Sequence, residues 1–330
     1  QPVAKHAEPL DPDSVLADRR NMAYMNSVVT RGRLEAIVVG DERTMQVAGD
    51  RVLRILAAAG VETVPPHVFP GAPELYAQYE NCELLRDALR DVDAIAVAVG
   101  GGTLNDIVKR ASGELEREYL QIGTAASMDG FTAFGASIAL DGFKQTLSCP
   151  APAGSISDLT IMAEAPTVMT ASGYGDLLGK VPAGADWMIA DAVGVEKIDR
   201  AVWDLVQGRL RNALARPEAL VAGDEEAVAA LAEGNLLSGL AMQAMKSSRP
   251  ASGAGHQFSH TWEMEGHGLD WEPPLSHGFK VGVGTVASLA LWEEAMRLDL
   301  AELDVDRVVA EAPSQDDVVA RIRAALPERI

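Results

Sequence analysis

Short apolar runs alternate with stretches of helical periodicity through the first half of the chain. The apolar runs have the length of buried strands and cover residues 33–41, 61–69, 92–100 and 118–124. The periodic stretches repeat apolar positions at helical spacing and cover residues 43–60, 73–90 and a segment that begins near Thr103. Strands that alternate with helices in this way predict a parallel sheet with helices on both faces.

The pattern changes after residue 130. Residues 134–142 and 153–162 are predicted to be extended, on either side of a turn at Pro150 and Pro152. Beyond Pro166 the periodicity is helical, and the predicted helices cover residues 168–180, 184–192, 197–214, 224–248, 255–265, 278–298, 302–311 and 315–325. We therefore expect two domains, an α/β domain over residues 1–165 and an all-helical domain over residues 166–330.

Composition agrees with a two-domain globular protein and excludes some classes of partner. Of the 330 residues, 48% are hydrophobic and 23% charged, which is too apolar for a disordered chain. The 48 acidic residues exceed the 28 Lys and Arg, which gives a net charge of −20. Binding to nucleic acid or to an anionic membrane surface requires basic residues. The charge therefore points to a small-molecule partner.

Cysteine usage and hydropathy indicate a reducing compartment. Cys82 and Cys149 are far apart in the sequence and form no CxxC pair, which argues against a disulfide framework and against a thiolate zinc site. The first residues show no basic segment followed by an apolar one, and no apolar run approaches the roughly 20 residues of a membrane span. We expect a cytoplasmic protein without membrane insertion.

A glycine cluster stands where the third predicted strand passes into a helix. Glycines let the backbone approach a ligand closely, and a helix N-terminus favours the negative charge of a pyrophosphate. A tight turn without a ligand is the alternative, because the cluster is not GxGxxG. The candidates for cofactor binding here are Gly101, Gly102, Thr103, Leu104, Asn105 and Asp106.

Polar side chains also follow other strand ends. The next strand leads into Thr124, Ala125, Ala126, Ser127 and Asp129, and ligands of doubly wound sheets bind where neighbouring strands end. Asp41 ends the first strand, where it could accept hydrogen bonds from an adenosine ribose. Capping of the following helix is an equally good interpretation of Asp41.

Four of the six histidines lie within 22 residues, namely His256, His260, His267 and His277. The first two are four residues apart and therefore share one helical face. Imidazole suits Zn, Ni or Fe, and a catalytic metal site typically has about three protein ligands. HQFSH lacks the Glu of a metalloprotease HExxH motif, so a carboxylate must come from elsewhere. Asp176, an acidic residue within an apolar helical stretch, is the best candidate. A pair of surface histidines plus a helix cap is the alternative.

Six blocks in order resemble the sn-glycerol-1-phosphate dehydrogenases, a branch of the superfamily that contains iron-type alcohol dehydrogenases, glycerol dehydrogenases and dehydroquinate synthases. The resemblance runs from about residue 30 to residue 298. The blocks are VGGGTLNDIVK, GTAASMDGF, DGFKQT, SGYGDLLGKVPAGADW, SSRPASGAGHQFSHTWEM and SHGFKVGVGT. The resemblance implies a dehydroquinate synthase-like fold, with an α/β dinucleotide-binding domain followed by an all-α domain.

The resemblance also implies roles for individual residues. Asp176, His256 and His277 would bind the metal, and Asp176 would also contact substrate. Asp129 and His260 would contact substrate and serve catalysis. Residues 102–106 would hold the phosphates of NAD or NADP, and residues 124–127 would line the nicotinamide side. The metal would be divalent, with Zn favoured over Ni or Fe.

Three positions depart from patterns in the superfamily. Ala133 stands where a Ser usually contacts NAD, and Gly255 stands where a Glu usually precedes the first metal histidine. Lys180 stands where some iron-type alcohol dehydrogenases have a fourth, histidine ligand, which fits a site with three ligands.

The implied reaction is reduction of dihydroxyacetone phosphate to sn-glycerol 1-phosphate. An acidic protein needs local cations to bind such a phosphate. The candidates for a phosphate clamp are Lys144, Lys180, Lys246, Arg249 and Lys280. Lys246 and Arg249 could instead stabilise the end of the helix that precedes them.

Three other functions are considered. A glycerol dehydrogenase would share the metal and the hydride chemistry but lack the phosphate site. A dehydroquinate synthase-like cyclase is disfavoured because it would need a Glu ligand and more basic residues. A relative that binds nucleotide without turnover is the non-enzymatic alternative. The departures at Ala133 and Gly255 leave it open, while the joint presence of Asp176, His256, His260 and His277 speaks against it. The family resemblance also implies a homodimer or larger homo-oligomer.

Overall fold

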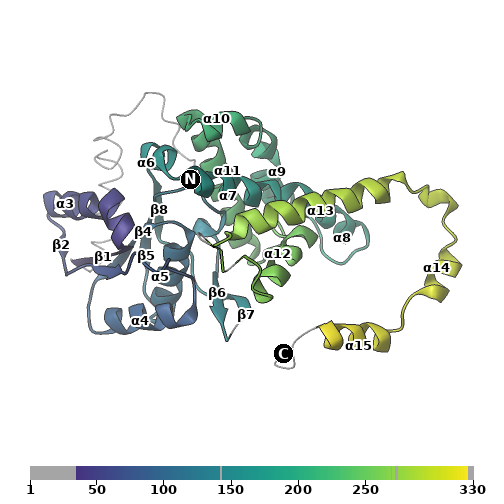
Figure 1. Cartoon of the computed structure of the whole chain (residues 1–330), viewed down its shortest axis with the longest axis horizontal. Coiled ribbons are helices and arrows are strands. Elements are labelled where there is room, and N and C mark those ends of the chain that lie inside the picture. The colour runs from purple at the N-terminus through teal and green to yellow at the C-terminus, as the bar shows by residue number, and fades with distance from the viewer. Residues whose placement is uncertain (1–34, 142, 269, 272–273, 326–330) are drawn as a thin grey trace. The chain divides into compact units, whose positions relative to one another are not determined.

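A parallel sheet forms the first half of the chain in the computed structural model, which describes residues 35–141, 143–268, 270–271 and 274–325 (Figure 1). The strands are β1 (Glu35–Asp41), β2 (Glu62–Thr63), β3 (His67–Phe69), β4 (Ile95–Gly100), β5 (Tyr119–Gly123) and β8 (Gly154–Ser157). Their order is β2-β1-β4-β5-β8, β3 also pairs with β1, and every pairing in this sheet is parallel. The predicted parallel sheet is confirmed, while residues 33 and 34 of the predicted first strand lie outside the described residues.

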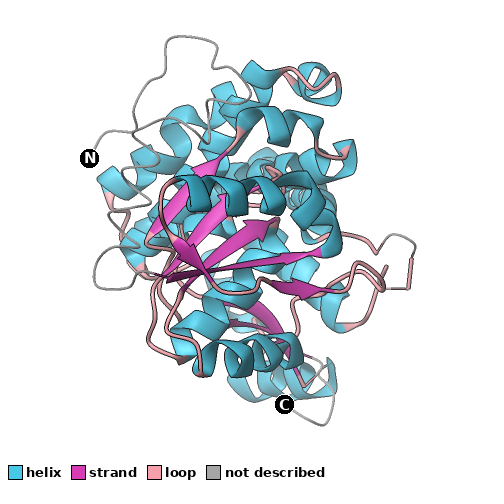
Figure 2. Ribbon diagram, turned by 90° about the vertical axis from the view of Figure 1, so that its left-hand side faces the viewer, coloured by secondary structure: helices cyan, strands magenta, loops and turns pink. Residues whose placement is uncertain are grey.

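Helices cover both faces of this sheet, as Figure 2 shows. Alternate residues of β1 point to opposite faces, so Val38 packs with α3 (Asp50–Ala58). Val39 packs on the other face with α4 (Tyr79–Arg90) and α5 (Gly102–Glu114). Two apolar cores therefore enclose the sheet, as its uninterrupted apolar strands predict.

Two predicted helices differ in detail from the observed ones. The helix predicted over residues 43–60 consists of α2 (Glu42–Thr44), a π-helical segment (Met45–Gly49) and α3. The helix predicted over residues 73–90 begins only at Tyr79. Gln78 has extended backbone and forms a bridge with Ala139, so the chain before Tyr79 cannot be helical.

The extended region after residue 130 contains a hairpin and a sheet strand. The hairpin pairs β6 (Ala136–Leu140) with β7 (Phe143–Leu147) in antiparallel register. The extended segment predicted over residues 153–162 ends with β8 at Ser157, because the Asp158 carboxylate accepts hydrogen bonds from the Thr160 and Ile161 amides and begins a helix there. That part of the extended prediction was wrong.

Helices account for the rest of the described chain, and beyond Pro166 they agree with the predicted periodicity except for α10, which was not predicted. They are α6 (Leu159–Glu164), α7 (Thr167–Leu178), α8 (Lys180–Ala192), α9 (Arg200–Ala213), α10 (Pro217–Val221), α11 (Glu225–Met245), α12 (Ala254–Met264), α13 (His277–Arg297), α14 (Val305–Glu311) and α15 (Gln315–Ala325), with short 3-10 turns at Gly130–Thr132 and Leu300–Glu302.

Contacts divide the chain into compact units of residues 1–289 and 290–330, and the two-domain division at residue 165 remains a prediction. Within the described residues, no helix combines the length and apolarity that a membrane span requires.

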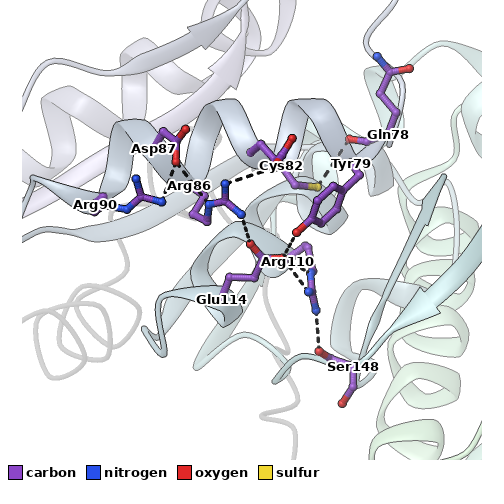
Figure 3. A network of polar contacts seen from close by, with 10 residues as sticks. Gln78, Tyr79, Cys82, Arg86, Asp87, Arg90, Arg110, Glu114 and Ser148 are labelled. Atoms are coloured by element: carbon purple, nitrogen blue, oxygen red, sulfur yellow. Dashed lines mark hydrogen bonds and ion pairs between the residues drawn. The ribbon is translucent and has the colours of Figure 1, made fainter. Parts of the chain in front are cut away.

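Glu114 anchors the last turn of α5 (Figure 3). Its carboxylate accepts hydrogen bonds from the Tyr79 hydroxyl at 2.7 Å, from Arg86 at 2.7 Å and from Arg110 at 2.8 Å. Arg110 also donates to the Ser148 carbonyl at 3.0 Å. These bonds tie α5 to α4 and to the segment after β7. The orientation of α5 is therefore fixed independently of any ligand at its N-terminus.

The second half of the chain meets the sheet through α7. A Cβ at Gly173 would lie 1.7 Å from the carbonyl oxygen of Ala126, in the segment that follows β5. No side chain other than hydrogen fits there, because the neighbouring atom belongs to backbone and cannot rotate away.

We predict that Gly173→Ala destabilises the protein by at least about 2 kcal/mol, because the added methyl forces α7 away from residue 126. The matched control is Gly208→Ala on α9, where nothing lies within 4 Å of an added Cβ. That substitution should stabilise the protein by about 0.4–1 kcal/mol. Urea unfolding of both variants checks the prediction, and equal effects would contradict it.

Candidate metal and cofactor site

The N-terminus of α5 is built to receive an anion. Gly101 precedes the helix with extended backbone, and no side chain caps it. The first bond of the helix runs from the Asn105 amide to the Gly101 carbonyl, which leaves the amides of Gly102, Thr103 and Leu104 without helical partners. Such amides and the helix dipole together favour a phosphate group.

The segment after β5 lies beside this helix end. Gly100 and Gly123 are directly paired at the ends of β4 and β5, and the Thr124 amide donates to the Gly100 carbonyl at 3.2 Å. A Cβ at Gly102 would lie 2.3 Å from the Met128 sulfur, so glycine is needed for these two turns to touch. The structure thus brings the two predicted cofactor-binding segments together.

Three of the predicted cofactor residues have structural partners of their own. The Asp41 side chain accepts hydrogen bonds from the Arg43 and Thr44 amides, which is the capping alternative. Asn105 is buried and accepts from the Tyr119 hydroxyl at 3.0 Å. Asp106 is buried and accepts from the Ser137 amide at 3.2 Å.

Asp176, His256 and His277 converge although they are distant in the sequence. Asp176 lies in α7, His256 lies in α12 and His277 is the first residue of α13. One potential ligand atom from each lies within 4.8 Å of the others. His256 Nε2 is 3.4 Å from Asp176 Oδ1, and the rings of His256 and His277 have centroids 5.8 Å apart. The predicted carboxylate and two imidazoles therefore form one cluster.

Glycines in α7 and α13 permit this convergence. A Cβ at Gly175 would lie 2.5 Å from the Gly278 carbonyl oxygen, and a Cβ at Gly278 would lie 1.9 Å from the Ser172 carbonyl oxygen. The two helices consequently meet backbone against backbone next to Asp176 and His277. A chain of hydroxyls strengthens the junction, since Ser276 Oγ donates to Ser172 Oγ at 2.9 Å, and Ser172 Oγ donates to the Ser127 carbonyl at 3.1 Å.

Lys180 lies between two buried carboxylates. Its ammonium is 2.8 Å from Asp176 Oδ1 and 2.8 Å from Asp129 Oδ2, and its side chain is fully buried. Asp129 Oδ2 also accepts from Ser238 Oγ at 2.8 Å, and the Asp129 amide donates to Asp176 Oδ2 at 3.1 Å. Burial would raise the pKa of Asp176, but the Lys180 ammonium and the two histidines outweigh it and lower that pKa well below its usual range.

A third histidine, His260, lies beside the cluster. Its ring centroid is 5.7 Å from that of His277 and 6.4 Å from that of His256. Burial, with the neighbouring histidines, lowers the pKa of His260 to about 4, so the ring is neutral at pH 7. His267, in contrast, is exposed and pairs with Glu265 at 2.9 Å, outside the cluster.

Glu263 orients His277, a contact that the sequence analysis missed. Its carboxylate is 3.2 Å from His277 Nδ1, and its side chain is 4% exposed. A carboxylate accepts hydrogen bonds only, so in a neutral His277 ring Nδ1 carries the proton and Nε2 keeps its lone pair for a metal. Lys144 pairs with Glu263 at 3.1 Å. Glu263 lies seven residues after His256, two helical turns along the same helix, and that spacing was the signal available in the sequence.

The donor set fits a divalent metal. Two imidazoles and a carboxylate are ligands that Zn, Ni and Fe accept. Both Asp176 oxygens already accept one hydrogen bond each, but a carboxylate oxygen has two lone pairs, so Asp176 Oδ1 can accept a cation as well.

The five predicted clamp residues have different environments. Lys180 is committed to the two aspartates, and Arg249 pairs with Glu196 at 2.6 Å. Lys246 is exposed at the end of α11, in the left-handed conformation that ends the helix. Lys144 and Lys280 are the two that lie near the histidine cluster, through their interactions with Glu263.

Solved structures with this fold include a probable dehydrogenase and a synthase. A probable glycerol dehydrogenase from Sinorhizobium meliloti matches with a TM-score of 0.64 and 20% identity, over 95% of this chain and 78% of that one. A 2-epi-5-epi-valiolone synthase from Streptomyces hygroscopicus, solved with NAD⁺ and Zn²⁺ bound, matches with a TM-score of 0.58 and 21% identity, over 88% of this chain and 79% of that one. The fold is therefore the one predicted, that of the iron-type alcohol dehydrogenases and their dehydroquinate synthase-like relatives.

Sequence relatives narrow this class. The family model of the iron-containing alcohol dehydrogenases matches residues 17–166. A glycerol-1-phosphate dehydrogenase [NAD(P)+] from Halalkalibacterium halodurans is 33% identical over 291 residues, which are 87% of this chain and 72% of the relative. One from Bacillus velezensis is 35% identical over 272 residues, 81% of this chain and 68% of the relative. The chain belongs to the glycerol-1-phosphate dehydrogenase family.

We predict that Lys180→Met destabilises the metal-free protein by about 3–5 kcal/mol, because it leaves Asp129 and Asp176 as buried carboxylates without their cation. The matched control is Lys197→Met, which removes a lysine with a 78% exposed side chain and should change the free energy of unfolding by less than about 0.5 kcal/mol. Urea unfolding in the presence of a chelator measures both. A loss below about 1 kcal/mol for Lys180→Met would show that the pairing is not structurally important.

Proposed function

We propose that this protein reduces dihydroxyacetone phosphate to sn-glycerol 1-phosphate with NADH or NADPH and one divalent metal. The observation that supports this most directly is the convergence of Asp176, His256 and His277 in a chain of this family. The free amides at the start of α5 support dinucleotide binding at the neighbouring strand ends. A bound zinc and NAD⁺ in the valiolone synthase support the same pair of cofactors here.

In this proposal Asp176, His256 and His277 hold the metal, which when bound supplies Lewis-acid polarisation of the substrate carbonyl. Glu263 keeps His277 Nε2 directed at that position. Residues 124–127 would line the reduced nicotinamide, which when bound supplies a hydride. Asp129, held by Lys180 and Ser238, lies next to the metal ligands, where it contacts substrate.

His260 has the role of general acid in the proposal. It lies beside both metal histidines, and its half-buried ring retains access to solvent. A protonated ring, or a water that it holds, delivers a proton to the oxygen of the reduced carbonyl. Its low pKa favours delivery through a held water at neutral pH.

The proposal also includes two predictions of the sequence analysis. The protein is cytoplasmic, and it forms a homodimer or a larger homo-oligomer. Both remain inferences from the sequence and the family resemblance. Size-exclusion chromatography with light scattering tests the second directly.

We predict oxidation of NADH or NADPH with dihydroxyacetone phosphate, loss of that activity on chelation, and its return with Zn or Ni. Absorbance of the reduced nicotinamide is the measurement. The product should be inert to an enzyme specific for the sn-glycerol 3-phosphate enantiomer. Turnover of dihydroxyacetone at least as fast as that of its phosphate would instead identify a glycerol dehydrogenase, and absence of turnover with bound nucleotide would identify a non-catalytic relative.

A second prediction concerns Glu263. Replacement by Gln removes the charge that orients His277 and should weaken Zn binding about 10-fold, since partners of metal-bound histidines typically contribute 10- to 100-fold. Competition with a coloured chelator measures the affinity without reference to activity. The matched control is Glu265→Gln, two residues away and exposed. Equal Zn affinities in both variants would refute the orienting role.

A further inference from the structure

Lys280 is a buried cation without a counterpart. It lies on α13, three residues after His277, and it is 2% exposed. Its amine has no hydrogen-bond partner among the residues that the structure describes. A buried ammonium in this condition is costly, and natural proteins retain such groups mainly where a ligand completes them.

The charged residues near Lys280 do not provide its amine with a hydrogen-bond acceptor. Glu263 and Lys144 both act on the pKa of Lys280, Glu263 raising it and Lys144 lowering it, while burial has the largest effect and lowers it. Glu263 is itself bonded to Lys144 and to His277. Glu263, Lys144 and Lys280 thus count one carboxylate against two lysines, which is an excess of one positive charge.

The neighbouring group has the opposite imbalance. Asp129 and Asp176 share the single cation of Lys180, so one excess negative charge remains there. His277 joins the two groups, since it belongs to the cluster with Asp176 and its Nδ1 contacts Glu263. A site that is negative at one end and positive at the other suits a metal ion at the first and an anion at the second.

We infer that Lys280 and Lys144 form the subsite for the phosphate group of the substrate. The inference rests on the proposed function, and it identifies which of the candidate cations bind the substrate phosphate. A phosphate here would give the Lys280 amine its missing acceptor and pair with the excess positive charge. The carbonyl of the same molecule would lie towards Asp176 and His256. Lys144 and His277 provide the access, because their side chains are 13% and 25% exposed.

The test compares Lys280→Met with wild-type protein loaded with Zn and NADH. Loss of one charge-assisted hydrogen bond should raise the KM for dihydroxyacetone phosphate about 10- to 100-fold. Inhibition by inorganic phosphate, competitive with that substrate, should weaken by a similar factor. Lys280→Arg should restore part of both effects. The Zn affinity from chelator competition and the KM for NADH should stay within about twofold of wild type.

Controls separate this inference from its alternatives. Lys246→Met replaces the exposed candidate and Lys197→Met an unrelated exposed lysine, and both should leave the KM unchanged. An unchanged KM and unchanged phosphate inhibition in Lys280→Met would overturn the subsite, as would a raised KM in Lys246→Met alone. If the wild-type protein does not reduce dihydroxyacetone phosphate, the proposed function fails. Binding of inorganic phosphate, measured by calorimetry in wild type and Lys280→Met, then decides the subsite by itself.

Discussion

The close approach of α7 to its neighbours is the constraint on which the site depends. Along this helix, Gly173 touches the backbone of residue 126 and Gly175 touches the backbone of residue 278. Through the first contact the helical half meets the ends of the sheet strands, where the proposed dinucleotide site lies. Through the second, Asp176 meets His277. Side chains at either position would push α7 away from its neighbours and separate the two halves of the site.

Electrostatics then distinguishes the two ends of the site. The fully buried Lys180 lowers the electrostatic cost of placing Asp129 and Asp176 next to each other, but it leaves them an unmatched charge that a metal complements. On the other side of His277, Glu263 pairs with Lys144 and interacts electrostatically with Lys280. The strongly acidic chain, with its net charge of −20, thus keeps a small positive region where an anionic substrate would otherwise be repelled.

Much of this arrangement could be predicted from local sequence patterns. Apolar runs located β1, β4 and β5, and the glycines after β4 identified the helix end, because strand, turn and helix each leave a short-range signal. The six ordered blocks supplied the metal triad, which no spacing rule could have assembled from residues eighty positions apart. The roles of Lys180 and Glu263 could not be predicted, since each is defined by partners on other elements. The role of Asp158 as the N-cap of α6 was missed for a simpler reason. The apolar residues that follow it favoured an extended segment over a helix start.

The hydroxyl chain from Ser276 through Ser172 to the Ser127 carbonyl joins the two halves of the site in a way that packing alone does not. Ser127 belongs to the segment that is proposed to line the nicotinamide, and Ser276 immediately precedes His277. In the proposed function, a displacement of Ser127 on loading of the nucleotide would be transmitted through these bonds to Ser276 and His277. The two loadings would then be coupled, and reciprocity would require each to alter the affinity of the other by the same factor.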